Sequence, residues 1–319
     1  MLATDMQIGT VFPQQPSGAP EPSNFVDATI EQGRLAHELG VRSAWFGQLM
    51  SYDSPALATL VGREVPGLTV GSSAVPIIGR HPVLLAAQAR TAQAATAGRF
   101  QLGIALGAGS FLDPLLGTTT SRPIAHLREF LTALGPLLRT GEVDYAGELV
   151  TARTPWPSDL PGAQPPPPVL VAAMGPQALR VTGELADGAL PFLAGPKTLA
   201  EHLVPTLTKA ASAAGRPAPR VVAFVPATVT SRPDEVRAGA YEQLAFYESI
   251  PSYRAVLDRD GVVRAGDLAL VGSPDQVADG LRRYADAGAT EIVLSQAGPA
   301  SADDQRRTFE LIGKLSQAL

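Results

Sequence analysis

Short apolar runs alternate with longer amphipathic segments along the whole chain, and this alternation constrains the fold more than any other feature. Runs of strand length, rich in Val, Leu, Ile and Phe, are separated by stretches of helical length and period. This order is typical of repeated βα units around a parallel sheet. A chain of 319 residues built in this way forms either two small domains or one large α/β barrel.

We count eight βα units. The predicted strands are residues 6–12, 42–46, 68–75, 100–106, 168–173, 188–193, 220–228 and 291–295. The predicted helices are residues 24–40, 54–63, 82–97, 121–139, 176–186, 197–214, 233–248, 274–287 and 302–318. Two segments interrupt the alternation: a hairpin-like, proline-rich one at 140–168 and another at 246–267. We expect both to be insertions into a single domain of residues 1–319.

The helix at 274–287 carries signals at both ends. Ser273 is the predicted N-cap, Pro274 takes the first helical position, and Gly288 follows the last turn. These residue types start and stop helices through local hydrogen bonds and backbone geometry. We therefore expect this helix to begin and end close to the predicted residues.

The helix at 24–40 has similar but weaker signals. Ser23 is the predicted N-cap and Gly40 the predicted end. The apolar side chains expected to share its buried face are Val26, Ile30 and Leu35.

The composition excludes several classes of function. The 45% hydrophobic content and mean hydropathy of +0.10 describe a soluble protein with an ample core. With 25 basic and 30 acidic residues, the chain offers no basic field for nucleic acid or a membrane surface, so neither is an expected partner. The sequence contains no cysteine, so redox chemistry needs a bound cofactor. No secretory pattern or long apolar run is present, and we expect a cytoplasmic protein.

The residues that follow the predicted strands are the first candidates for a site, because parallel α/β folds bind ligands at the carboxyl ends of their strands. They are small, glycine-rich and mostly uncharged, as at 47–49, 72–76, 107–110 and 172–176. No GxSxG or HExxH motif occurs, and the four histidines have no metal-ligand spacing, so no metal is expected. Such a face suits a large flat cofactor that brings its own reactivity.

The turn that reads AAMGPQAL, between the predicted strand 168–173 and the next helix, has two interpretations. Pro176 takes the first helical position, so the amides of Gly175, Gln177 and Ala178 point outward at the positive end of the helix dipole. A phosphate would find several donors there. An ordinary helix start has the same residues, and the sequence alone favours it.

Two further segments also keep two interpretations. The run from Gly107 to Ser110 lacks the third glycine of a dinucleotide fingerprint, so it is a tight turn or a place where a cofactor approaches the backbone. His81 in GRHP is predicted to cap the helix at 82–97, where the helix dipole favours a neutral ring. It acts either as a plain N-cap or as a proton donor.

Five stretches together resemble the bacterial luciferase-like family of flavin and deazaflavin enzymes. They are IGTVFP, GVRSAWFGQ, TVGSSAVPIIGRHPVLLAAQARTAQAATAGRFQLGIALGAG, PPPPVLVAAMGPQALRVTGELADGALPFLAGP and GSPDQVADGLRRYADAGATEIVL. The resemblance implies a (β/α)8 TIM barrel with an insertion after strand seven, and it implies a homodimer. SAWFGQL followed by RHP resembles the branch that uses coenzyme F420, a deazaflavin, rather than FMN.

The resemblance also assigns residues to the coenzyme. It implies a non-prolyl cis peptide bond at Ser73–Ala74, behind the central ring. The residues implied to line the ring are Gly107, Ala108, Gly109 and Ser110. The residues implied to bind the coenzyme's phosphate are Ala173, Met174, Gly175, Pro176, Gln177 and Ala178.

One departure from the family pattern bears on the reaction. Many relatives carry an acidic residue and then histidine after strand two, and these handle the substrate proton in deazaflavin-dependent sugar-phosphate dehydrogenases. This chain has Gln48 and Leu49 instead. The expected reaction is therefore hydride transfer from reduced F420 to an activated C=C or C=N bond of a small organic substrate. The catalytic candidates are Gln48, Tyr52 and His81, with Tyr52, His81 or solvent as the proton donor.

Two other functions stay open. One is an FMN-dependent luciferase-like monooxygenase, which requires a flavin because a 5-deazaflavin does not readily activate oxygen. The other is a barrel without a cofactor that binds only a ligand or a partner subunit. In each case we expect specificity to reside in the loops at 14–23, 49–54, 111–121 and 246–267.

Overall fold

The computed structural model describes residues 6–107, 109–119 and 121–317. Their contacts divide them into two compact units, each assembled from separate stretches of the chain. The first unit comprises the described residues of Met1–Trp45, Leu190–Pro205 and Arg220–Leu319, and the second those of Phe46–Ala189 and Thr206–Pro219. The single domain expected from the sequence stays a prediction.

The first unit contains five strands and most of the helices that follow them. Its strands are β1 (Gln7–Phe12), β2 (Ser43–Phe46, whose last residue belongs to the second unit), β10 (Arg220–Val229), β11 (Leu270–Gly272) and β12 (Glu291–Gln296). Its helices are α1 (Phe25–Glu38), α7 (Pro196–Thr198), the π-helix η1 (Leu199–Leu203), α9 (Pro233–Glu248), α10 (Pro251–Asp260), the 3-10 helix η2 (Ala265–Leu268), α11 (Pro274–Asp286) and α12 (Ala302–Gln317).

The second unit contains the predicted site residues that the structure describes, most of them in turns between its strands and helices. Its strands are β3 (Thr69–Ser72), β4 (Val75–Pro76), β5 (Phe100–Ala105), β6 (Asp144–Ala146), β7 (Thr151–Arg153), β8 (Val169–Ala172) and β9 (Gly188–Ala189). Its helices are α2 (Ser54–Glu64), α3 (Pro82–Ala95), α4 (Gly109–Leu116), α5 (Pro123–Thr140), α6 (Pro176–Leu185) and most of α8 (Val204–Ala213).

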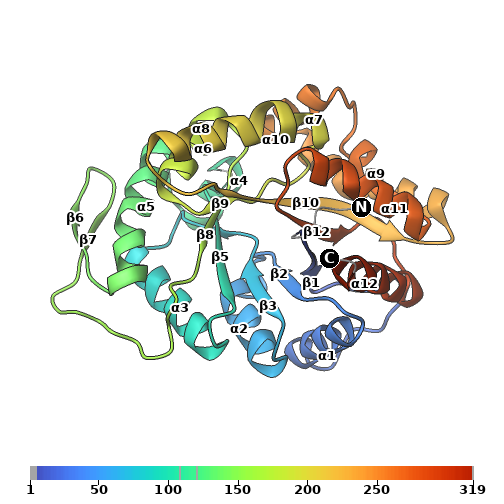
Figure 1. Cartoon of the computed structure of the whole chain (residues 1–319), viewed down its shortest axis with the longest axis horizontal. Coiled ribbons are helices and arrows are strands. Elements are labelled where there is room, and N and C mark those ends of the chain that lie inside the picture. Colours follow the sequence, from blue (N-terminus) through green and yellow to red (C-terminus); the bar gives the residue numbers. More distant parts are fainter. Residues whose placement is uncertain (1–5, 108, 120, 318–319) are drawn as a thin grey trace. The chain divides into compact units, whose positions relative to one another are not determined.

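The strands follow the order β11-β10-β12-β1-β2-β3-β5-β8-β9, with β4 paired to β5. The pairs β1–β12, β10–β12 and β5–β8 are parallel, and helices alternate with the strands along the chain (Figure 1). This is the order of a (β/α)8 TIM barrel, which confirms the predicted fold class. None of the helices in the described ranges combines the length and the apolar character needed to cross a membrane.

The helix α11 starts and ends as the sequence predicts. Ser273 accepts a hydrogen bond from the amide of Gln276, whose side chain in turn accepts from the Ser273 amide, so the two form a capping box. Pro274 opens the helix, and Gly288 after its end has a left-handed φ of 99°.

The predictions for α1 were wrong in two respects. Its N-cap is Asn24, not Ser23, and the Asn24 side chain accepts from the amides of Val26 and Asp27. Of the three residues predicted to share a face, Val26 and Ile30 are half-buried, whereas Leu35 is 37% exposed. The fully buried residues on the same side as Val26 and Ile30 are the smaller Thr29, Gly33 and Ala36. Small side chains let a helix pack close to its neighbours. At the most buried positions of α1, small size therefore matters more than hydrophobicity.

The segment at 140–168 contains the predicted hairpin. Asp144 pairs with Arg153 and Ala146 with Thr151 in the antiparallel pair β6–β7. The carboxylate of Glu129, on α5, accepts from the backbone amides of residues 148–150 at the hairpin turn. Figure 1 shows the hairpin reaching outward beside α5.

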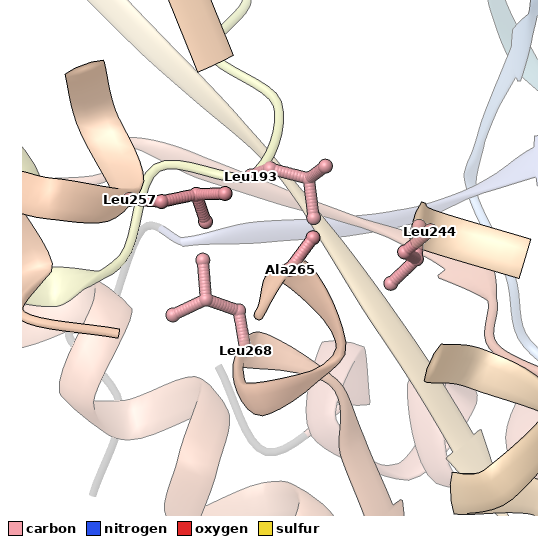
Figure 2. Close-up of a cluster of buried hydrophobic side chains, with 5 residues drawn as sticks. All are labelled: Leu193, Leu244, Leu257, Ala265 and Leu268. Carbon is pink, nitrogen blue, oxygen red and sulfur yellow. The ribbon is translucent and has the colours of Figure 1, made fainter. Parts of the chain in front are cut away.

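The segment at 246–267 contains α10 and most of η2, and its status as an insertion stays a prediction. Figure 2 shows the apolar cluster that attaches it to the rest of the first unit. The members of this cluster are Leu193, Leu244, Leu257, Ala265 and Leu268.

Four further elements differ from the prediction. The strand expected at 188–193 is only two residues long, and the helix expected at 197–214 is divided into α7, η1 and α8. The strand β11 and the helix α4 were not predicted, and α4 occupies most of the expected loop at 111–121.

Candidate active site

Neighbouring parallel strands of the second unit bring the predicted coenzyme segments to one edge. Pro76 of β4 lies opposite Ala105 of β5, and Ala105 lies opposite Ala172 of β8. Adjacent strands are about 4.8 Å apart, so the turns that follow these residues emerge side by side. This is the carboxyl edge, where ligands of parallel sheets bind.

The chain between β3 and β4 contains the non-prolyl cis peptide bond predicted at Ser73–Ala74. Both residues are half-buried, and the Ser73 amide donates to the Phe46 carbonyl at 2.7 Å. The position of a coenzyme ring in front of this bond stays a prediction.

The turn after β5 needs a glycine at position 107 for reasons of packing. Gly107 has a left-handed φ of 83°, and a Cβ there would lie 2.6 Å from Leu112 Cδ1 and 3.1 Å from Ile78 Cδ1. Gly109 begins α4. Ala108 lies outside the described residues, as does the side chain of Ser110, so their predicted roles are untested.

The helix α6 begins as the sequence predicts, with Gly175 as N-cap and Pro176 in the first turn. Ala173 is buried and Met174 half-buried in the turn before it, while Gln177 is exposed and Ala178 buried in its first turn. No side chain of the described residues caps this helix, and a Cβ on Gly175 would meet no atom within 4 Å. A side chain added at Gly175 would therefore enter open space at the start of α6.

A second Gly-Pro helix start, in the first unit, provides a contrast. At Gly195 the carboxylate of Asp260 accepts from the amides of Gly195 and Thr198, at 2.7 and 3.0 Å. A side-chain anion thus caps the helix N-terminus there, whereas no described side chain caps the N-terminus of α6.

A hollow of about 470 Å³ in the second unit contains two of the three predicted catalytic residues, Gln48 and Tyr52. Its other lining residues are Leu49, Met50, Ser51, Asp53, Pro76, Ile78, Gly79, Arg80, Leu112 and Leu116. Ile78 and Leu112 are also the side chains that pack against Gly107, so the hollow adjoins the turn after β5.

The polar groups of the hollow form one network. Arg80 Nη2 lies 3.1 Å from Asp53 Oδ2, and the other oxygen of Asp53 accepts from Gln88 Nε2 at 2.7 Å and from the Ala56 amide at 2.9 Å. Arg80 Nη1 donates to Gln88 Oε1 at 3.4 Å. The charges of Arg80 and Asp53 therefore offset each other within the hollow.

Gln48 holds the loop after β2 in place. Its Nε2 donates to the carbonyls of Leu49 and Tyr52, each at 2.7 Å. Its Oε1 accepts from the amide and hydroxyl of Ser54, at 3.0 and 3.2 Å. The side chain thus fixes the position of Tyr52, whose pKa is raised by burial. The phenol is protonated at neutral pH even with its ordinary pKa, so its hydroxyl can donate a hydrogen bond.

His81 caps α3, as predicted. Its Nδ1 accepts from the Val83 amide at 3.3 Å, and its Nε2 lies 2.9 Å from the Thr151 carbonyl. A carbonyl only accepts, so Nε2 carries the proton and the ring is used as a structural link between α3 and β7. This favours the N-cap interpretation over the proton donor.

Arg80, Asp53 and Gln88 were not among the site residues predicted from the sequence. The available signal was Arg80 itself, a charged residue in the GRHP segment beside otherwise uncharged strand ends. Within the described ranges, no group of three or more His, Asp or Glu side chains is arranged to hold a metal ion.

The fold is that of an α/β barrel, and comparison with known proteins gives the family. The model of the luciferase-like monooxygenase family matches residues 6–291. The chain belongs to this family.

Three similar proteins illustrate the range of the family. The F420-dependent glucose-6-phosphate dehydrogenase of Microbacterium testaceum is 25% identical, over 89% of this chain and 90% of its own. The coenzyme F420-dependent tetrahydromethanopterin reductase of Methanopyrus kandleri has the same fold, with a TM-score of 0.79, 21% identity and 98% of both chains covered. The 3,6-diketocamphane monooxygenase of Pseudomonas putida, in complex with FMN, has a TM-score of 0.77 at 18% identity, again over 98% of both chains.

Proposed function

We propose that this chain is a reductase that transfers hydride from reduced F420 to an activated C=C or C=N bond of a small organic substrate. The observation that carries the proposal is the absence of an available base in the described lining of the hollow. Gln48 stands after β2 with its amide bonded to the loop, and the carboxylate of Asp53 is bonded to Arg80 and Gln88. Alcohol oxidation needs a group that takes the hydroxyl proton, whereas reduction does not.

The residues of the second unit fit a coenzyme that carries a phosphate. The amides of Gln177 and Ala178, at the uncapped start of α6, would hold the phosphate. Ser73–Ala74 and Gly107 would lie along the ring, at the same edge of the sheet. When bound, reduced F420 supplies the hydride. The F420-dependent relatives support this choice of coenzyme.

The residues of the hollow would orient the substrate and supply its proton. Gln48 fixes the loop, and the Tyr52 hydroxyl would donate a hydrogen bond to the substrate atom on which negative charge develops. The phenol is protonated at neutral pH, and burial, which raises the Tyr52 pKa, makes it a weaker acid than a free phenol.

Tyr52→Phe is expected to lower kcat about 100-fold, a typical contribution of a positioned proton donor. The F420 dissociation constant should not change, because the hydroxyl is assigned to the substrate. Single-turnover kinetics and coenzyme titration measure the two quantities. Tyr145→Phe, on the hairpin, is the control and should retain the wild-type rate. An unchanged rate in Tyr52→Phe would assign proton delivery to solvent.

The reaction itself can be followed without oxygen. Reduced F420 and 2-cyclohexen-1-one, an activated alkene, should be converted stoichiometrically to oxidised F420 and the saturated ketone. Failure to oxidise reduced F420 with any activated alkene or imine would contradict the reductase assignment.

The second candidate is an FMN-dependent monooxygenase, favoured by the likeness to the FMN complex of the diketocamphane enzyme. It requires oxygen uptake in the presence of reduced FMN, which an oxygen electrode detects. For either enzyme we propose a cytoplasmic homodimer whose partner is a small organic substrate, not a nucleic acid or a membrane. Sedimentation of the purified chain tests the dimer.

A further inference from the structure

The hollow that holds Gln48 and Tyr52 is walled largely by apolar side chains. Ile78 and Leu112 are almost fully buried, at 6% and 5% exposure. Leu49, Met50 and Leu116 are 55%, 62% and 46% exposed. Apolar surface therefore extends from the most buried part of the hollow to its rim.

Large exposed apolar side chains are concentrated on the two segments that form this rim. The loop after β2 carries Leu49 and Met50, and the eight-residue helix α4 carries Leu116, all three of which line the hollow. Soluble proteins rarely expose a contiguous apolar patch unless it binds something. A patch around a hollow of ligand size points to a ligand that is itself apolar.

The charged groups of the lining leave no partner for a charged ligand. Asp53 and Arg80 are paired at 3.1 Å, and both also bond to Gln88. An anionic substrate would have to displace Asp53 from Arg80, and a cationic one would have to displace Arg80 from Asp53. A charge that enters without such a partner loses its hydration with no compensation.

We propose that this hollow takes an uncharged, predominantly apolar substrate and discriminates against carboxylated or phosphorylated molecules of the same shape. The assignment as the substrate site rests on the proposed function, whereas the polarity preference rests on the lining alone. The one polar feature the substrate needs is a carbonyl or imine group, which activates the double bond and accepts a hydrogen bond from Tyr52.

The test compares two probes that differ in charge. Calorimetry measures binding of 4-phenyl-3-buten-2-one, a neutral enone, and of its para-carboxylate, to the full chain with and without oxidised F420. The neutral enone is expected to bind at least about tenfold more tightly. Equal or tighter binding of the carboxylate, or no binding of the neutral enone under either condition, would overturn the inference.

Two variants on α4 sharpen the test. Leu116→Lys places a cation in the lining. It is expected to weaken binding of the neutral enone about tenfold and to strengthen binding of the carboxylate. Leu115→Lys is the matched control, because Leu115 lies on the same helix, is about equally exposed and does not line the hollow. It should retain wild-type binding. The same change in both variants would show that the hollow is not the binding site.

A separate F420 titration distinguishes the two levels of the proposal. A chain that binds F420 but prefers the carboxylated enone contradicts only the polarity inference. A chain that prefers the neutral enone but does not bind F420 contradicts the proposed function and leaves the polarity inference standing.

Discussion

Replacing Gly175 with aspartate is expected to weaken F420 binding about 100-fold, because the new carboxylate occupies the amides that would hold the phosphate. Gly175 has the extended backbone of an N-cap, with φ −78° and ψ 150°, and a side chain there meets no atom within 4 Å. An N-cap aspartate accepts from the amides of the second or third helical residue, here Gln177 and Ala178. The loss corresponds to roughly 3 kcal/mol of charge-assisted hydrogen bonds.

The same substitution should not reduce stability. A carboxylate at a helix N-terminus adds about 0.5 kcal/mol to the free energy of unfolding through the cap and the helix dipole. Gly175→Ala is the control, since it adds a Cβ in open space without a charge and should bind F420 almost as the wild type does. Urea unfolding and coenzyme titration give the two quantities. Wild-type affinity in Gly175→Asp would show that the phosphate binds elsewhere.

Replacing Glu291 with alanine is expected to lower the free energy of unfolding by about 3 kcal/mol. Glu291 is 1% exposed at the start of β12. Its carboxylate accepts from Arg220 at 2.7 Å, from Ser43 at 2.9 Å and from the Trp45 indole at 3.1 Å. The substitution leaves the Arg220 guanidinium without its buried counter-charge. The Arg220 side chain is 32% exposed, so solvent partly compensates its charge. The decrease in the free energy of unfolding should therefore lie at the lower end of the range for a broken buried ion pair.

Glu310→Ala provides the matched control for this prediction. Glu310 pairs with Arg306 one turn away on α12 at 3.1 Å, and both side chains are well exposed. Solvent screens such a pair, so its loss should cost less than about 0.5 kcal/mol. Urea unfolding measures both variants. Equal effects would show that the Glu291 network contributes no more than a surface pair.

The sequence predicted most of the fold because the relevant signals are local. Proline at the first helical position and a hydrogen-bonding side chain before it define the starts of α3 and α11, at His81 and Ser273. These signals depend on a few neighbouring residues, so they need no knowledge of tertiary contacts.

The errors in α1 and α4 have the opposite origin. The buried face of α1 contains Thr29, Gly33 and Ala36, and close packing around the helix selects these residues. The helix α4 exposes most of its apolar side chains and contains Pro114, so its pattern is not that of a helix with one buried face.

The candidate site was predictable only in part. The segments around Ser73, Gly107 and Gly175 follow neighbouring strands, and the rule on strand ends selects them. The network of Arg80, Asp53 and Gln88 was not predicted, because side-chain contacts join the N-cap of α2, the helix α3 and the loop between β4 and α3. No spacing along the chain encodes that arrangement.

The most direct test of the coenzyme assignment is an equilibrium titration of the purified protein with oxidised F420 and, separately, with FMN, followed by coenzyme fluorescence. F420 is expected to bind at least about tenfold more tightly than FMN, a difference of about 1.4 kcal/mol. Tight binding of FMN with no measurable binding of F420 would contradict the assignment and favour the monooxygenase.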